Sequence, residues 1–302
     1  MQNWRWFMFR ILLKLSIGFV AISAIVIGVA YIGQSSRDFH GVIIDAPGYS
    51  ISGEVSQGSD PGGPWVIFVH GNRKAGIAHP LYRAILQNID KSVSVVGIDM
   101  RGYGASSAKG MAEAERILDR EEDIVATAAW IKREFGAGEH QIVLIGHSIG
   151  ALQVLNAAGN ADYGGVIAIG PGAFERYVGN PDARRGYIAK IERNTGVRMS
   201  PEILVKDAEL LMLPSIFTPC PSGKIIVIHG AREKNMLNSR KGDVPAPCIG
   251  KISWQSISFS DHMYGSESQM VEPLASIYSL LARSLLMRQL NRSLLTIADS
   301  KN

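Results

Sequence analysis

The sequence has 302 residues, of which 46% are hydrophobic and 19% charged, so it is long enough for a large α/β domain with an appendage and too apolar for a disordered chain. Its net charge of +4 comes without a basic stripe interleaved with aromatic residues, and nucleic-acid binding is therefore not expected. The two cysteines, Cys220 and Cys248, form no C-x-x-C motif and lie far from any histidine cluster, so we expect no metal or other cofactor.

Residues 1–36 carry the features of a signal anchor. Arg5, Arg10 and Lys14 precede any acidic residue, and the stretch 15–32 is uncharged and about long enough to cross a bilayer core as a helix. Since cations flank the cytoplasmic end of such helices, we predict a transmembrane helix within residues 1–36. The remaining residues, 37–302, would then form an extracytoplasmic domain, periplasmic in a bacterium. A cleaved signal peptide and a buried core helix are the alternatives.

Strands and helices alternate through the middle of the chain. An antiparallel hairpin is predicted over Phe39–Val55. The next segments are predicted in the order strand Trp65–Val69, helix Pro80–Ile89, strand Val93–Ile98, helix Ala112–Phe135, a strand from Ile142, a helix to Ala158 and strand Gly165–Ile169. These strands are apolar throughout, which indicates a parallel sheet that is buried on both faces.

Residues 171–219 interrupt this alternation. The segment is cationic first and more apolar later, and it contains no clear strand. We predict a mainly helical insertion that forms a lid, with an ordinary sheet connection as the alternative. Strands over Lys224–Ile228 and Ile252–Phe259, and a closing helix or helix pair over Met270–Ile297, complete the chain.

The sequence Gly146-His147-Ser148-Ile149-Gly150 fits G-x-S-x-G between a strand and a helix, the context that a nucleophile elbow requires. Such a turn strains the serine backbone and leaves no room for side chains two residues before and after it, a condition that Gly146 and Gly150 meet. Ser148 is therefore the candidate nucleophile.

A serine nucleophile needs a histidine base that an acid holds in the correct tautomer. On this architecture the acid and then the histidine follow the serine in the chain. Only His229 and His262 come after Ser148. His229 lies inside a strand, so His262, in the polar loop after the last strand, is the candidate base. The candidate acids, in order of preference, are Glu233, Asp243 and Glu175.

An oxyanion hole needs two N–H donors aimed at one point. Ile149, directly after the serine, supplies one through its backbone, and Asn72, in the loop after the strand Trp65–Val69, is expected to supply the other. Ligands of parallel sheets bind beyond the carboxyl ends of the strands, so these groups can converge on one crevice.

With these motifs the sequence resembles the α/β-hydrolase superfamily, in particular membrane-anchored and secreted bacterial members related to serine aminopeptidase-like and lysophospholipase-like hydrolases. The resemblance is carried by His70-Gly71-Asn72, Asp99 to Ser106, Gly146 to Gly150, His229 to Glu233 and Asp261-His262-Met263. It implies an α/β-hydrolase fold, with a mostly parallel eight-stranded sheet flanked by helices. The family usually has Asp at the position of Glu233, although Glu serves in some members.

Cys220 and Cys248 are predicted to form a disulfide. Each lies four residues before a strand, at Lys224 and near Ile252. These strands should be parallel neighbours about 5 Å apart, so both cysteines enter the sheet at the same edge. A disulfide also fits the oxidising compartment that the signal anchor implies.

The expected function is that of a serine hydrolase, either carboxylesterase/lipase-like or peptidase-like. It would cleave an ester, thioester or amide of a small-molecule or lipid-like acyl substrate through an acyl-enzyme on Ser148. The alternative is a non-catalytic α/β-hydrolase-like protein that binds a ligand without turnover.

Overall fold

The computed structural model describes residues 37–106, 120–172, 174–212, 215–233, 242–258, 260–264 and 274–299. The predicted anchor, residues 1–36, lies outside these ranges. Residues 112–119 of the helix expected from Ala112 also lie outside them. None of the helices within the ranges is both long and apolar enough to cross a membrane.

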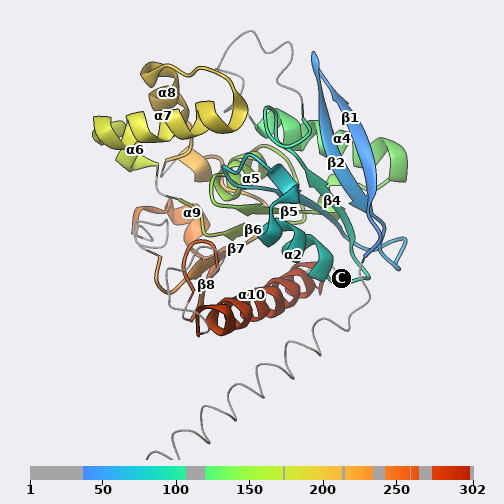
Figure 1. Cartoon of the computed structure of the whole chain (residues 1–302). Helices are drawn as coiled ribbons and strands as arrows, with labels where there is room; N and C mark the ends of the chain where they lie inside the picture. The colour runs from blue at the N-terminus through green and yellow to red at the C-terminus, as the bar shows by residue number, and fades with distance from the viewer. Residues whose placement is uncertain are drawn as a thin grey trace, which may run out of the picture.

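The core of the molecule is one eight-stranded sheet with the order β1-β2-β4-β3-β5-β6-β7-β8 (Figure 1). The strands are β1 (His40–Ala46), β2 (Tyr49–Ser56), β3 (Trp65–Val69), β4 (Ser94–Ile98), β5 (Ile142–His147), β6 (Gly165–Ile169), β7 (Lys224–Gly230) and β8 (Ile252–Ile257). The pairs β1–β2 and β2–β4 are antiparallel, and every later pair is parallel. The predicted mostly parallel, eight-stranded sheet is therefore confirmed.

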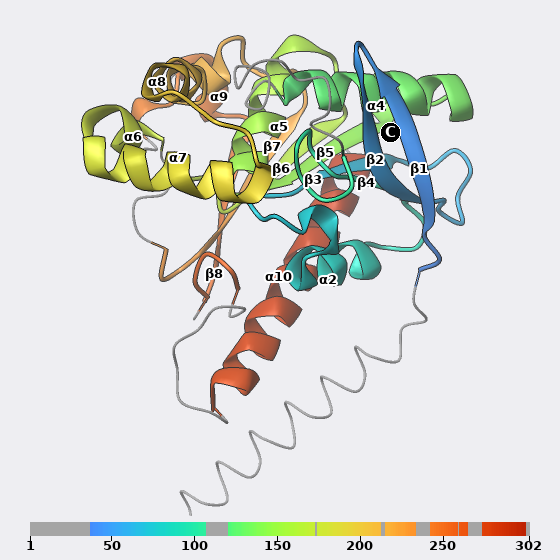
Figure 2. The same ribbon diagram turned by 45° about the horizontal axis from the view of Figure 1, so that its top comes forward.

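Helices cover both faces of the sheet (Figures 1 and 2). On one face lie α2 (Pro80–Asn88) and α10 (Leu274–Asp299), and on the other lie α4 (Glu121–Phe135) and α5 (Ile149–Asn160). Two apolar clusters fill the two interfaces. All residues of β3, β4, β5 and β6 are buried, which explains why these strands are apolar at every position instead of at alternate ones.

The ends of α4 follow from its sequence. Glu121, Glu122 and Asp123 stand in the first turn, where the helix dipole favours negative charge, and Lys132 stands in the last. Gly136 ends the helix in the left-handed conformation, with φ of 70°, and donates its N–H to the carbonyl of Lys132. The described helix begins at Glu121, with Arg120 as the residue before its first turn. The expected start at Ala112 lies outside the described residues.

The segment between β6 and β7 is mainly helical. It contains α6 (Glu175–Gly179), α7 (Pro181–Thr195), α8 (Pro201–Leu210) and the 3-10 turn η3 (Ser215–Phe217). The start of α7 is set by Asn180, whose side chain accepts from the first N–H groups, and by Pro181 in the first helical position. In Figure 2 helices α6, α7 and α8 form one group at the upper left, where they pack against one another. The expected helical content is thus observed, and the role of a lid stays a prediction.

The predicted pairing of Cys220 with Cys248 is confirmed. The two residues form a disulfide, and their Cα atoms are 5.7 Å apart. They come together because β7 and β8 are parallel neighbours in register, with Ile225 opposite Ile252. Cys248 lies in the short helix α9 (Ala246–Ile249), so the bridge ties the entry of β8 to the entry of β7.

Candidate active site

The turn between β5 and α5 has the geometry of a nucleophile elbow. Ser148 has φ of 58° and ψ of −119°, a backbone conformation that residues other than glycine rarely adopt. A Cβ atom on Gly146 would lie 2.2 Å from the carbonyl oxygen of Gly150. A Cβ atom on Gly150 would lie 2.5 Å from the carbonyl oxygens of Val69 and His70. Both glycines are therefore required by close backbone contacts.

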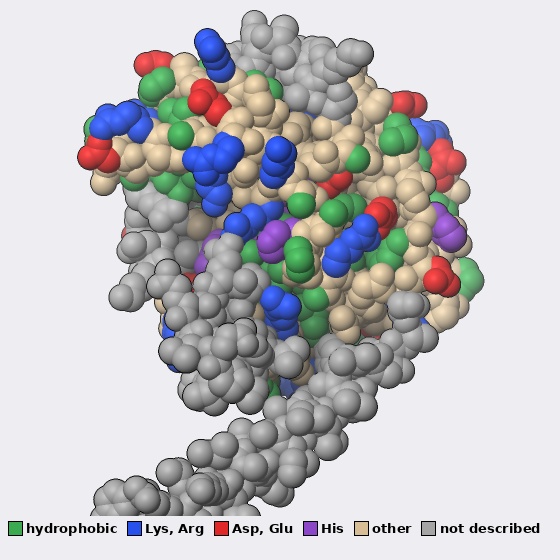
Figure 3. Space-filling model, viewed as in Figure 1, with side chains coloured by type: hydrophobic (Ala, Val, Ile, Leu, Met, Phe, Trp, Pro, Cys, Tyr) green, Lys and Arg blue, Asp and Glu red, His purple; other side chains and the backbone are tan. Residues whose placement is uncertain are grey.

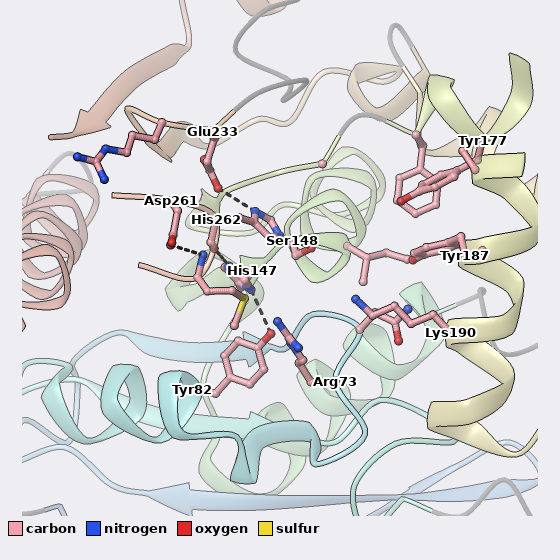
Figure 4. Close-up of a pocket in the computed structure, with 18 residues that line it drawn as sticks. Arg73, Tyr82, His147, Ser148, Tyr177, Tyr187, Lys190, Glu233, Asp261 and His262 are labelled. Carbon is pink, nitrogen blue, oxygen red and sulfur yellow. Dashed lines mark hydrogen bonds and ion pairs between the residues drawn. The ribbon is translucent and has the colours of Figure 1, made fainter. Parts of the chain in front are cut away.

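Three side chains form a hydrogen-bonded chain at the carboxyl ends of β5, β7 and β8 (Figure 4). His262 Nε2 lies 2.9 Å from Ser148 Oγ, and His262 Nδ1 lies 2.8 Å from Glu233 Oε1. An ionised carboxylate only accepts hydrogen bonds, so Nδ1 carries the ring proton and donates to Glu233. Nε2 is then the acceptor for the Ser148 hydroxyl, which is the arrangement that a general base requires.

The carboxylate of Glu233 is held on its other side as well. Its Oε2 accepts from the N–H of Gly230 at 2.8 Å, and its side chain is 0% exposed, whereas that of His262 is 38% exposed. Gly170, after β6, makes room for this pair. With φ of +53°, it would place a Cβ atom 2.9 Å from Glu233 Oε1 and 3.2 Å from His262 Nδ1. Sequence reasoning did not find Gly170, although a glycine directly after a buried strand was a usable signal.

The other sequence candidates lie elsewhere. Asp243 is exposed, and neither it nor Glu175, the first residue of α6, lines the pocket around Ser148. His229 is buried within β7. Among the described residues, the structure thus brings only Glu233 of the three candidate acids to within hydrogen-bond distance of His262.

The loop after β3 lies against the elbow. A Cβ atom on Gly71 would be 3.0 Å from the Cβ atom of Ser148, and Asn72 lines the pocket next to it. The side-chain oxygen of Asn72 accepts from Tyr103 Oη at 2.8 Å and from Asn194 Nδ2 of α7 at 2.7 Å. Helix α7 of the inserted segment is therefore bonded directly to this loop.

A pocket of about 730 Å³ opens over Ser148. Helix α7 lines one side with residues at helical spacing, and the elbow, Tyr82 of α2 and the segments after β3, β6, β7 and β8 line the others. The lining residues of α7 are Ala183, Gly186, Tyr187 and Lys190. Within the described parts of the chain, no group of three or more His, Cys, Asp and Glu could hold a metal ion.

The sequence model of the alpha/beta hydrolase family matches residues 66–232, more than half of the chain. The chain belongs to this family. No curated protein matches the sequence.

Solved structures share the fold of this α/β hydrolase at low identity. Est1E from Butyrivibrio proteoclasticus, solved with ferulic acid, is 16% identical with a TM-score of 0.54, over 82% of this chain and 99% of that one. An esterase from Pyrococcus furiosus is 15% identical with a TM-score of 0.56, over 83% and 91%. The acylaminoacyl peptidase of Pyrococcus horikoshii is 14% identical with a TM-score of 0.62, over 88% of this chain and 42% of that one. At these identities the likeness concerns the fold.

A second hydrogen-bonded chain supports the loop of His262 in this α/β hydrolase, and sequence reasoning missed it. The ring of His147 lies 2.9 Å from the carbonyl oxygen of His262 through Nε2, and 3.1 Å from Tyr82 Oη through Nδ1. A carbonyl only accepts, so Nε2 carries the proton, and Nδ1 accepts from the Tyr82 hydroxyl. Tyr82 Oη in turn accepts from the N–H of Gly71 at 3.0 Å. The chain links α2 and the loop after β3 to the backbone of His262.

Burial keeps two histidines beside the site neutral. Burial lowers the pKa of the His70 ring to about 3, and His70 Nε2 accepts from the N–H of Met100 at 3.0 Å. The pKa of His147 is also lowered well below its ordinary value, first by burial and then by the proximity of His262.

We expect the α/β hydrolase to lose stability as the pH falls from 7 to 5. Both buried histidines have a folded-state pKa below the unfolded value near 6.5, so the unfolded chain takes up protons first. The stability they contribute is complete above about pH 6.5 and is lost as the pH falls, by about 1.4 kcal/mol per pH unit for each ring. Urea unfolding at pH 7, 6 and 5 measures the slope. His147→Gln should reduce this slope by the contribution of one proton, about 1.4 kcal/mol per pH unit. His140→Gln changes an exposed histidine and should leave the slope unchanged. Equal slopes in both variants would contradict this account.

Proposed function

We propose that this chain is a serine hydrolase that cleaves an ester, thioester or amide through an acyl-enzyme on Ser148. The observation that supports it is the hydrogen-bonded chain from Ser148 Oγ through both ring nitrogens of His262 to Glu233, at 2.9 Å and 2.8 Å. The esterases and the peptidase among the structures of similar fold are consistent with a hydrolase. Family membership supports the same class of reaction.

In the proposed first step, Ser148 Oγ attacks the carbonyl carbon of the substrate and His262 Nε2 takes the hydroxyl proton. The ring becomes positively charged as the proton arrives, and the buried carboxylate of Glu233 stabilises that charge at Nδ1. When the tetrahedral intermediate collapses, the proton on Nε2 passes to the leaving group. Water then attacks the acyl-enzyme with His262 as base, which releases the acid and restores Ser148.

The negative oxygen of the tetrahedral intermediate would be stabilised by two backbone donors. Ile149 is the first residue of α5, and the first N–H groups of a helix have no partner within it. Asn72 lines the pocket over Ser148, and its side-chain oxygen accepts from Tyr103 and Asn194, which supports its main-chain N–H as the second donor. Loss of one such donor costs about 3 kcal/mol of transition-state stabilisation.

A fluorophosphonate probe tests the proposal because it reacts with a serine hydroxyl only where a base activates it. The wild-type protein is expected to gain one adduct, which peptide mapping places on the peptide that contains Ser148. Ser148→Ala should gain none and should also lose hydrolysis of 4-nitrophenyl esters. A parallel urea unfolding curve shows whether the variant is still folded. A folded wild-type protein that takes up no probe would contradict the proposal and favour the alternative of a non-catalytic ligand-binding protein.

We also propose that residues 1–36 anchor the enzyme in a membrane with its catalytic domain outside the cytoplasm. Three cations before an uncharged stretch, and a disulfide between Cys220 and Cys248, support this proposal. The full-length protein is expected to stay in the membrane pellet after carbonate extraction, and its catalytic domain to be cut by protease added to the extracytoplasmic side. Release by carbonate, or protection from that protease, would contradict it.

A further inference from the structure

The pocket over Ser148 is lined by charged side chains of both signs (Figure 4). The lining carboxylates, Glu233 and Asp261, come from the loops after β7 and β8, and so does one lining cation, Arg232. On the opposite side of Ser148 lie Arg73, from the loop after β3, and Lys190, from α7. Two of the three lining cations in the described part of the chain therefore lie on the side of the nucleophile that is away from the carboxylates.

The two carboxylates are occupied within their own loops. Glu233 binds His262 and the N–H of Gly230, and Asp261 Oδ1 accepts from the N–H of Met263 at 3.0 Å. Their placement next to His262 also keeps them away from the Arg73 side of the pocket in Figure 4. Both carboxylates thus have hydrogen-bond partners close to His262.

Lys190 belongs to the face of α7 that is turned toward the site. It lies seven residues after Ala183 and three after Tyr187, and all three line the pocket. Arg185 lies on the outer surface of the same helix, with a side chain that is 71% exposed and paired with Asp182. Lys and Arg side chains gather on this face of the molecule, over α7 and beside the histidines at its centre (Figure 3).

The rest of the wall near Lys190 is aromatic. Tyr177 and Tyr187 stack with their ring centres 4.4 Å apart, and Phe174 meets both rings edge-on. All three side chains line the pocket. An aromatic wall next to two cations suits a substrate that has an apolar part and an anionic group close together.

We propose that the substrate carries an anionic group, a carboxylate or a phosphate, next to the bond that is cleaved, and that Arg73 and Lys190 bind it. Arg73 would bind such a group through two parallel N–H donors, and Lys190 would act as a point charge. This inference rests on the proposed function, because it concerns the substrate of the same site.

Three activated esters of one acyl length test the inference. 4-Nitrophenyl hexanoate is neutral, mono-4-nitrophenyl adipate carries a carboxylate on its acyl part, and 3-carboxy-4-nitrophenyl hexanoate carries one on its leaving group. The wild-type enzyme is expected to prefer one of the two anionic esters over the neutral one about tenfold in kcat/KM. Spontaneous hydrolysis is measured with Ser148→Ala and subtracted.

The variants assign this preference to the two cations. Lys190→Gln is expected to reduce the ratio of anionic to neutral kcat/KM about fivefold, and Arg73→Gln to reduce it further, because Arg73 is half-buried and less screened by solvent. Arg185→Gln is the matched control, since it removes a cation from the outer surface of the same helix and should leave the ratio unchanged. Added salt should lower the wild-type ratio.

The anionic group can belong to a soluble acid or to a lipid headgroup, and vesicles separate these sources. Fatty-acid release is compared between phosphatidylglycerol and phosphatidylcholine vesicles. Faster release from phosphatidylglycerol that is lost in Lys190→Gln supports a headgroup phosphate, and a preference confined to the soluble esters supports a soluble acid.

Equal kcat/KM for the three soluble esters together with equal release from both vesicles would overturn the inference, and so would a preference that Lys190→Gln and Arg73→Gln leave intact. In either case, continued hydrolysis of the neutral ester and labelling of Ser148 would leave the proposed function standing. Absence of both hydrolysis and labelling would instead contradict the proposed function itself.

Discussion

Glu233→Gln is expected to lower kcat about 10⁴-fold, as loss of the acid does where it sets the tautomer of a catalytic histidine. The size of the effect follows from the two groups that Glu233 binds. The N–H of Gly230 can only donate, so the amide oxygen of the new side chain would face it. The amide NH₂ would then face His262 Nδ1 as a donor. The ring would be driven to the tautomer with its proton on Nε2, which cannot accept from Ser148.

Steady-state kinetics with a 4-nitrophenyl ester measure this loss, and Asp243→Asn is the matched control. Asp243 is also an acidic residue between β7 and β8, but it is exposed and lies outside the pocket lining. Its variant should therefore keep the wild-type kcat. Urea unfolding of both variants separates a change in chemistry from a change in folding. A Glu233→Gln enzyme with nearly full activity, or a comparable loss in Asp243→Asn, would show that another carboxylate orients His262.

Gly150→Ala is expected to destabilise the folded protein by about 3 kcal/mol, near the top of the usual range for overpacking. The added Cβ would lie 2.5 Å from two backbone oxygens, those of Val69 and His70 at the end of β3. Neither oxygen belongs to a flexible side chain, so α5 and β3 would have to move apart. The movement would also shift the loop that carries Asn72, and activity should fall together with stability.

Gly186→Ala is the control for this variant. Gly186 is also helical, in α7, and nothing lies within 4 Å of the Cβ atom it would gain. The change should therefore leave stability unaltered or raise it by up to about 1 kcal/mol, since alanine favours helix over glycine. Urea unfolding curves of both variants decide the matter. Equal stability of Gly150→Ala and wild type would mean that the elbow does not pack as tightly as the structure indicates.

Local patterns in the sequence were sufficient to predict the architecture. A strand buried on both faces must be apolar at every position, so Trp65–Val69 and Gly165–Ile169 could be recognised within a few residues. The elbow could be recognised for the same reason, because the requirement for two glycines around Ser148 arises within one turn of chain. Even the pairing of Cys220 with Cys248 followed from a local rule, since both lie four residues before strands that are neighbours in the sheet.

The arrangement around His262 depended on contacts between segments that are distant in the chain. The sequence ranked Glu233 ahead of Asp243 and Glu175, but all three follow strands or stand in predicted loops, so the other two could not be excluded. The position of Glu233 follows from the turn after β7, from Gly230, and from the space that Gly170 leaves after β6. Such spaces are created by packing between strands and cannot be read from either segment alone.

The sheet, the elbow with Ser148, the disulfide and His262 as the candidate base could all be predicted from the order of the residues, because each depends on residues close together or on a simple parallel register. Three further features became apparent only from the folded chain: Glu233 contacts His262, His147 and Tyr82 support the loop of His262, and α7 turns Lys190 toward the pocket. Those choices depend on the directions in which side chains point once helices and loops have packed, and direction is a property of the folded chain.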